Sequence, residues 1–154
     1  MMSSVVILDG LTAIVRPSRW RLVTCSELER RSAVEDGERL LLFFTQAAHH
    51  ALVAIECVAG TISFVHLCSL GRPLPVSVVA MLARFGAHDQ MLRGCPRQQN
   101  GVDCGFFVLA LARYVVALVS PLSAVRRVEA GAVDKVTDAY MAQQRAWLRG
   151  LSED

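Results

Sequence analysis

The hydrophobic residues in the middle of the chain form three runs of strand length. Residues 39–44 are apolar at almost every position, which is typical of a strand buried on both faces. Residues 51–58 and 61–67 form two further apolar runs, and Gly60 lies between them. A glycine between two such runs favours a tight turn, so we predict that they form a β-hairpin.

Three later segments have the spacing of helices. Residues 76–85 place apolar side chains on one side of a helix, which Gly86 would end. Residues 106–119 are apolar except for Arg113, and they predict a buried helix because the run is too short to span a bilayer. Residues 133–151 carry apolar side chains at helical spacing and predict a last amphipathic helix.

The N-terminal part gives the weakest pattern. Two short apolar runs, residues 5–8 and 11–15, are separated by Asp9 and Gly10, which read as a break between them. Residues 20–23 fit a short strand. Residues 26–38 are strongly charged and predict a solvated helix and loop.

The composition is that of one globular domain. Of the 154 residues, 53% are hydrophobic and 19% are charged, which argues against disorder and is enough for a single core. We divide this domain into an N-terminal part (1–38), a core that holds the candidate site (39–120) and a C-terminal helical segment (121–154). The formal charge of +2 gives no argument for nucleic acid or an anionic membrane as a partner.

The five cysteines bear on metal binding and on location. They form no CxxC pair and no Cys/His array with zinc spacing, so we predict no structural metal. Their number is odd and the sequence shows no signal peptide, which favours a reducing compartment. We therefore expect an intracellular protein of the nucleus or cytoplasm.

One stretch, residues 94–107, changes from polar and turn-prone to apolar. Asn100 and Gly101 favour a tight turn, and Asp103 can accept hydrogen bonds from the first N–H groups of a helix. Cys104 would then begin the buried helix, where the helix dipole favours a thiolate. Two interpretations stay open: an activated nucleophile, or an inert cysteine at the start of a core helix.

A cysteine nucleophile needs a base within hydrogen-bond reach. His49 precedes the second predicted strand, where a base could project from the end of the sheet. Gln98, six residues before Cys104, could donate its amide N–H to a developing oxyanion. A histidine where a loop meets a strand is more often a structural residue whose ring nitrogens are hydrogen-bonded or solvated. The combination of His49, Gln98 and Cys104, rather than any one of them, therefore points to catalysis.

Two segments resemble the catalytic domain of the ubiquitin-like-protein-specific (SUMO, or sentrin) proteases. Residues 98–108, Gln-Gln-Asn-Gly-Val-Asp-Cys-Gly-Phe-Phe-Val, are similar to that family's Gln-x-Asn-Gly-Tyr-Asp-Cys-Gly segment. Residues 49–56, His-His-Ala-Leu-Val-Ala-Ile-Glu, are similar to its His-Trp-Ala-Leu segment. The resemblance implies an α+β, papain-like cysteine protease fold, in which helices flank a small mixed or antiparallel sheet and the nucleophile begins a buried helix. It assigns Cys104 as nucleophile, His49 as base and Gln98 as oxyanion donor.

The family's third catalytic residue, an Asp, is missing. When the hairpin is aligned without gaps, His66 takes the acid position and would lie one hydrogen bond behind His49, on the strand face it shares with residues 62 and 64. When the strand is given two extra residues, Cys68 takes the position instead. In serine proteases, impairing the acid costs about 10⁴ in turnover.

The resemblance also implies a substrate and a partner. It gives substrate-binding roles to Asn100, Gly101 and His50, which replaces the tryptophan over the family's glycine tunnel. The implied function is a monomeric cysteine peptidase without a cofactor, which cleaves after the C-terminal glycine of a ubiquitin-like modifier. Two alternatives stay open: a relative that binds a modifier without efficient turnover, and an acetyltransferase that uses the same residue geometry.

Overall fold

The computed structural model describes residues 2–90, 95, 97, 98 and 104–125, together with residues 143, 146, 147, 149 and 150. The predicted turn at Asn100 and Gly101, the capping residue Asp103 and most of the predicted helix at 133–151 lie outside this set. No helix within the described set is long and apolar enough to cross a membrane.

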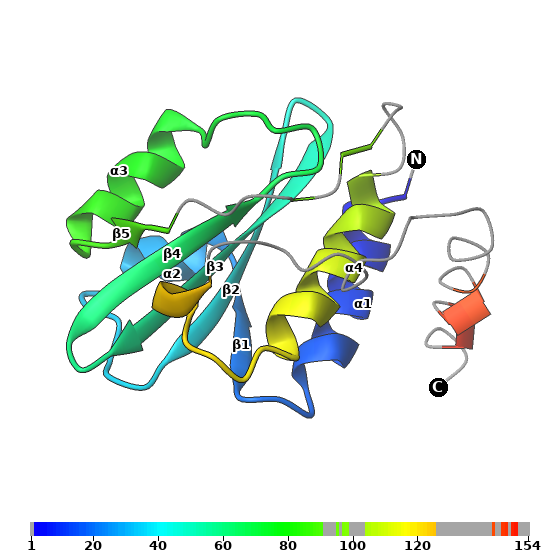
Figure 1. Ribbon diagram of the computed structural model, residues 1–154. Coiled ribbons are helices and arrows are strands. Elements are labelled where there is room, and N and C mark those ends of the chain that lie inside the picture. Colours follow the sequence, from blue (N-terminus) through cyan, green and yellow to red (C-terminus); the bar gives the residue numbers. More distant parts are fainter. Residues whose placement is uncertain are drawn as a thin grey trace.

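A five-stranded mixed sheet forms the centre of the molecule (Figure 1). Its strands, in spatial order, are β1 (Trp20–Val23), β2 (Arg39–Gln46), β3 (His49–Val58), β4 (Thr61–Leu67) and β5 (His88–Asp89). β1 runs parallel to β2 and β5 runs parallel to β4, whereas the three central strands are antiparallel. The three predicted strands and their hairpin are confirmed.

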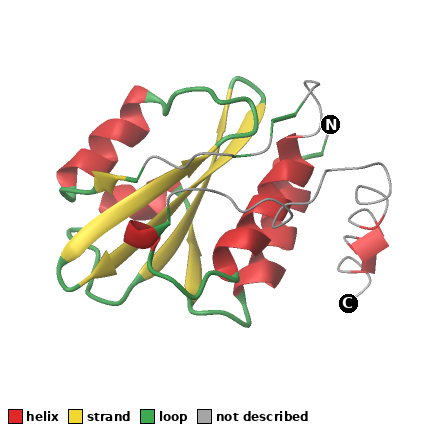
Figure 2. Cartoon of the chain, viewed as in Figure 1, coloured by secondary structure: helices red, strands yellow, loops and turns green. Residues whose placement is uncertain are grey.

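Helices cover both faces of this sheet (Figures 1 and 2). α1 (Ser4–Val15) and α4 (Cys104–Val116) pack on one face, and α2 (Cys25–Arg30) and α3 (Val76–Arg84) pack on the other. A short 3₁₀ turn, η1 (Leu122–Ala124), follows α4. This arrangement confirms the predicted α+β fold class, with Cys104 as the first residue of a buried helix.

Side-chain alternation along the strands divides the core into two layers. In β2, Leu41 and Phe43 point into the layer under α1 and α4, whereas Leu42 and Phe44 point into the layer under α2 and α3. All four side chains are buried, as predicted for a strand covered on both faces. The same alternation governs the two histidines that begin β3.

The interpretation of the N-terminal apolar runs was wrong. Residues 4–15 form one continuous helix, α1, in which Asp9 and Gly10 lie mid-helix. A glycine inside a helix costs about 1 kcal/mol relative to alanine. Burial of Ile7 and Leu11 against α4 offsets this cost, because both side chains are fully enclosed in the same core layer as that helix.

Candidate active site

His49 is held at the start of β3 by a two-residue hairpin turn. Ala47 and Ala48, which connect β2 to β3, have φ values of 47° and 60°. Two successive positive φ angles are typical of the tight turns that match the twist of a hairpin, but alanine adopts them at a cost of about 1–2 kcal/mol per residue. The pairing of Gln46 with His49 closes the hairpin, so His49 begins the strand rather than ending a loop.

The imidazole of His49 contacts Cys68. His49 Nε2 lies 3.2 Å from Cys68 Sγ, and both side chains are buried. Cys68 directly follows β4 and packs in the core layer under α3. The structure therefore puts Cys68 at the position behind the histidine, as the alignment with two extra strand residues predicted.

The expectation that His66 would stand one hydrogen bond behind His49 was wrong. His66 pairs with Val53, which is four residues along β3 from His49, or about 13 Å at the rise of a strand. No hydrogen bond joins the two histidines, both of which belong to the described part of the chain. Register explains the difference, because a two-residue turn at Ala59 and Gly60 brings Cys68 rather than His66 toward the start of β3.

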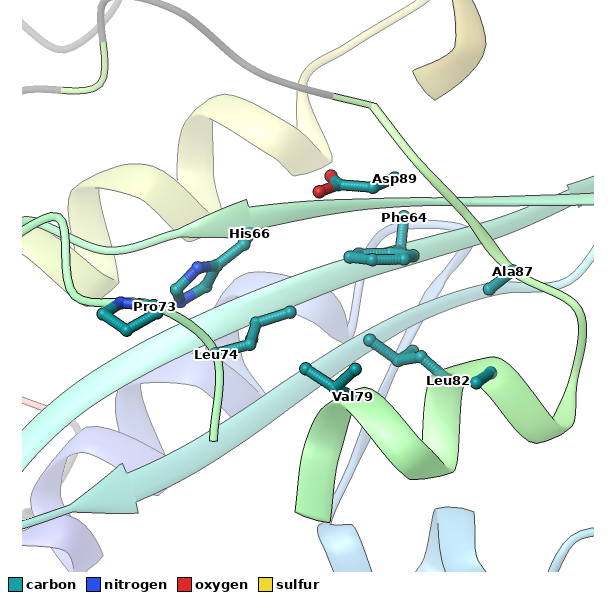
Figure 3. A pocket seen from close by; sticks show the side chains of 9 residues that line it. Phe64, His66, Pro73, Leu74, Val79, Leu82, Ala87 and Asp89 are labelled. Carbon is teal, nitrogen blue, oxygen red and sulfur yellow. The ribbon is translucent and has the colours of Figure 1, made fainter. Parts of the chain in front are cut away.

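His66 instead lines an apolar pocket under α3. Its ring stacks on Phe44, with centroids 6.1 Å apart, and Figure 3 shows it among Pro73 and Leu74. Burial, and to a lesser extent the charge of His49, lowers the pKa of His66 to about 4. His66 is therefore neutral near pH 7. Phe64, on the same face of β4, is also buried.

Gln98 is tied to the residue after Cys68. Its backbone N–H donates to the Ser69 carbonyl oxygen over 3.0 Å, and its side-chain oxygen accepts a short hydrogen bond from the Ser69 hydroxyl. Gln98 is buried. The side-chain bond engages the acceptor end of the amide, and the two bonds together bring Gln98 beside Cys68, which in turn contacts His49.

Cys104 is fully buried at the start of α4. The next position leaves little room for a side chain, because an added Cβ on Gly105 would lie 3.0 Å from Ile7 Cδ1 of α1 and from Met2 Cβ, which precedes α1. Glycine therefore lets α1 pack closely beside Cys104. The start of α4 lies at the same end of the molecule as the β2–β3 turn (Figure 1), but no hydrogen bond joins Cys104 to His49, both of them described residues.

His50 points to the opposite face of the sheet from His49. Its Nδ1 lies 2.9 Å from Thr45 Oγ1 and its ring packs on Phe43, in the layer under α1 and α4. Burial lowers the pKa of His50, and a hydrogen bond to the backbone of Met2 opposes that shift. His50 therefore lies beneath the N-terminal segment that also contacts Gly105, whereas Asn100 and Gly101 lie outside the described residues.

The electrostatics of the site favour a neutral His49. Burial is the main cause that lowers its pKa, and the positive charges of Arg72 and His50 add to the effect. Glu56 cannot serve as the missing acid, because seven strand residues, or about 23 Å, separate it from His49. Its carboxylate instead pairs with Arg39 over 2.8 Å and accepts a hydrogen bond from the Leu122 backbone.

Sequence reasoning missed the residues that surround the His49–Cys68 contact. A pocket of about 260 Å³ opens beside Cys68 and is also lined by Asp89, Cys95, Arg72 and Arg97. These side chains come from β5, from the segment between β4 and α3 and from the segment that follows β5, so no local spacing reveals that they meet. No group of described residues has the composition of a metal site.

No protein-family model matches the chain, and no curated protein matches its sequence. Solved structures do match its fold. The SUMO protease Ulp1 with its catalytic cysteine oxidised to a sulfenic acid gives a TM-score of 0.61 at 17% identity, over 97% of this chain and 76% of that one. Its sulfinic form gives 0.57 at 18% identity over the same shares, and its sulfonic form gives 0.52 at 18% identity over 86% and 72%. The chain therefore has the fold of Ulp1, as its sequence motifs implied.

Proposed function

We propose that the chain is a divergent cysteine peptidase of the SUMO-protease type, which cleaves after the C-terminal glycine of a ubiquitin-like modifier. The observation that carries this proposal is the contact of His49 with a side chain at the acid position, in a fold shared with the SUMO protease Ulp1. Two further features support it. Gln98 is bonded beside that contact, and Cys104 begins the buried helix that the motif predicts.

The roles follow from the two nitrogens of His49. Its Nε2 is occupied by Cys68, so Nδ1 is the atom that takes the proton of Cys104. The Cys104 sulfur then attacks the glycine carbonyl, and Gln98 donates its amide N–H to the oxyanion. His49 returns the proton to the leaving amine, and water hydrolyses the resulting thioester.

Cys68 is a weak substitute for a carboxylate. To accept a proton at Nδ1, His49 must carry its hydrogen at Nε2 and donate it to the Cys68 sulfur. A thiol sulfur is a poor acceptor and carries no charge to stabilise the imidazolium. We therefore infer slow turnover compared with an enzyme that has the carboxylate.

A second candidate function is a binding protein with little turnover. The full burial of Cys104, together with the missing carboxylate, favours it. Such a protein would bind the modifier at the site that holds His49 and Cys104, but Cys104 would not form a thioester with it.

A covalent probe distinguishes these functions. The probe is a panel of ubiquitin-like modifiers that carry an electrophile in place of the C-terminal glycine carboxylate, with peptide mapping of the adduct. We expect labelling at Cys104, loss of labelling in Cys104→Ser and full labelling in the control Cys57→Ser. Binding without an adduct would support the binding protein, and acylation of Cys104 by an acyl-coenzyme A instead would support the acetyltransferase.

The two histidines provide a matched test of the base. His49→Gln is expected to lower labelling strongly. His50→Gln is expected to lower it less, because His50 points to the opposite face of the sheet and can affect only the binding of the modifier, not the proton of Cys104. The reverse result would reject His49 as the base.

A further inference from the structure

Cys68 has the surroundings of a nucleophile as well as those of an orienting group. Its sulfur lies 3.2 Å from His49 Nε2, which is the distance at which an imidazole can take a thiol proton. Burial keeps the pKa of His49 low, so the ring is neutral and able to accept near pH 7. The same imidazole can thus serve two thiols, Cys104 through Nδ1 and Cys68 through Nε2.

The tautomer of His49 decides which thiol is served. With hydrogen on Nε2, the ring donates to Cys68 and its Nδ1 can act as base for Cys104. With hydrogen on Nδ1, the ring accepts from the Cys68 S–H group. A carboxylate would hold the first tautomer by accepting from Nε2–H, but a thiol can donate as well as accept. The replacement of the acid by a cysteine therefore leaves both tautomers open.

The pocket beside Cys68 carries a net positive charge. Two guanidinium groups, Arg72 and Arg97, line it against one carboxylate, Asp89. Neither arginine makes an ion pair with another described residue. His66, which also lines the pocket, is neutral because burial lowers its pKa to about 4.

The loop after Cys68 is shaped to bring Arg97 into this pocket. Gly71 has a φ of 64°, and the Arg97 guanidinium occupies the space where a side chain at position 71 would lie. Gly71 also donates its backbone N–H to the Cys68 carbonyl oxygen over 3.1 Å. Glycine is therefore needed here both for the backbone angle and for the approach of the positive charge to Cys68.

We propose that Cys68 is a second reactive thiol, activated by His49, and that its pocket selects small anionic disulfides. The Cys68 sulfur attacks one sulfur of the disulfide as its proton passes to His49 Nε2. A new bond forms between Cys68 and that sulfur, the disulfide bond breaks, and the other half leaves as an anionic thiolate. The proton then passes from His49 to solvent. A thiol reductant reverses the modification.

Two disulfide reagents of different charge test this proposal on the full chain. The dianionic dithiobis(nitrobenzoate) and the neutral dithiodipyridine are each reacted with the protein in excess, and the rate at each cysteine is followed by mass spectrometry. Cys25 is the internal control, since it is more exposed than Cys68 and the charged side chain that acts on it is Glu29 rather than a histidine. We expect the dianionic reagent to modify Cys68 about tenfold faster than Cys25 or more. His49→Gln should remove that advantage.

The charge of the pocket is tested separately. The double variant Arg72→Gln, Arg97→Gln is expected to slow the dianionic reagent at Cys68 by about tenfold and to leave the neutral reagent unchanged. Reaction at Cys68 no faster than at Cys25 with both reagents would overturn the second nucleophile. Equal slowing of both reagents in the arginine variant would overturn the anion selectivity. No modifier is used, so these outcomes are independent of the peptidase proposal.

Discussion

Ser69 and Gln98 are joined by two hydrogen bonds, one through the backbone and one through the side chains. They are 29 residues apart in sequence, and Ser69 directly follows Cys68. The segment that carries the proposed oxyanion donor is therefore fastened to the segment that contacts His49. The proposed oxyanion donor and the proposed partner of His49 therefore belong to one hydrogen-bonded unit.

The first prediction concerns the two hydrogen bonds between Ser69 and Gln98. Gln98→Ala is expected to lower kcat by about 10²-fold, because an oxyanion donor is lost. Ser69→Ala keeps the backbone bond but frees the amide to rotate, so it should lower kcat by about threefold to tenfold. The measurement is turnover of a fluorogenic modifier substrate. Gln99→Ala is the neighbouring control, and an effect as large as that of Gln98→Ala would reject the assignment.

The sequence was sufficient for the core and for the position of Cys104, because both depend on local patterns. The apolar runs of β2 and β3 specify a sheet buried on both sides. α1 was missed for a physical reason. Asp9 and Gly10 have low helix propensity, and the burial of α1 against α4 overrides it, which a local pattern cannot reveal.

The sequence left open whether His66 or Cys68 takes the position of the family's catalytic Asp, and the reason is different. His66 lies in β4 and Cys68 follows that strand directly, two residues further on, so alternation puts both on the same side of the sheet and cannot choose between them. The choice depends on the hairpin register, which a two-residue turn at Ala59 and Gly60 sets. The pocket residues Arg72 and Arg97 were missed because the tertiary fold alone brings them together.

The second prediction concerns the strained turn before His49. Ala48→Gly is expected to raise the free energy of unfolding by about 1 kcal/mol, since glycine adopts a positive φ without the clash of a Cβ. Gly60→Ala, in the turn between β3 and β4, is the control for the reverse change, from glycine to alanine at a positive φ. Its added Cβ would meet open space, so its expected loss of about 1 kcal/mol reflects the backbone angle alone. Chemical denaturation measures the free energy of unfolding of both variants. A lower value for Ala48→Gly than for the unmodified chain would contradict backbone strain at Ala48.

The third prediction concerns pH and stability. The pKa of His66 falls from 6.5 in the unfolded chain to about 4 in the folded one, so between these values the unfolded chain binds a proton that the folded chain does not. The free energy of unfolding should therefore decrease as pH falls from 6.5 toward 4, and this contribution should level off below that.

The variant His66→Phe tests this assignment. A phenylalanine keeps the stacking on Phe44 but cannot titrate, so the pH dependence of unfolding should become shallower. His49 and His50 still contribute to the pH dependence of unfolding in this variant, because burial lowers the pKa of both. An unaltered slope in His66→Phe would show that His66 does not titrate in this way.

The fourth prediction restores the missing charge. Cys68→Asp is expected to raise kcat by about tenfold or more, because a carboxylate at the Sγ position would accept from His49 Nε2–H and stabilise the imidazolium. The same charge should raise the pKa of His49, which NMR titration of the imidazole measures directly. It should also abolish disulfide exchange at position 68.

Two control variants show whether the effect of Cys68→Asp comes from the negative charge of the new side chain, from its shape or from its position in the strand pair. Cys68→Asn offers a similar acceptor without the charge, so it should leave the pKa of His49 nearly unchanged and raise kcat less. His66→Asp puts the carboxylate opposite Val53, about 13 Å along the strand from His49, and should lower stability without a gain in turnover. If His66→Asp restored activity and Cys68→Asp did not, the contact between His49 and Cys68 would have no part in catalysis.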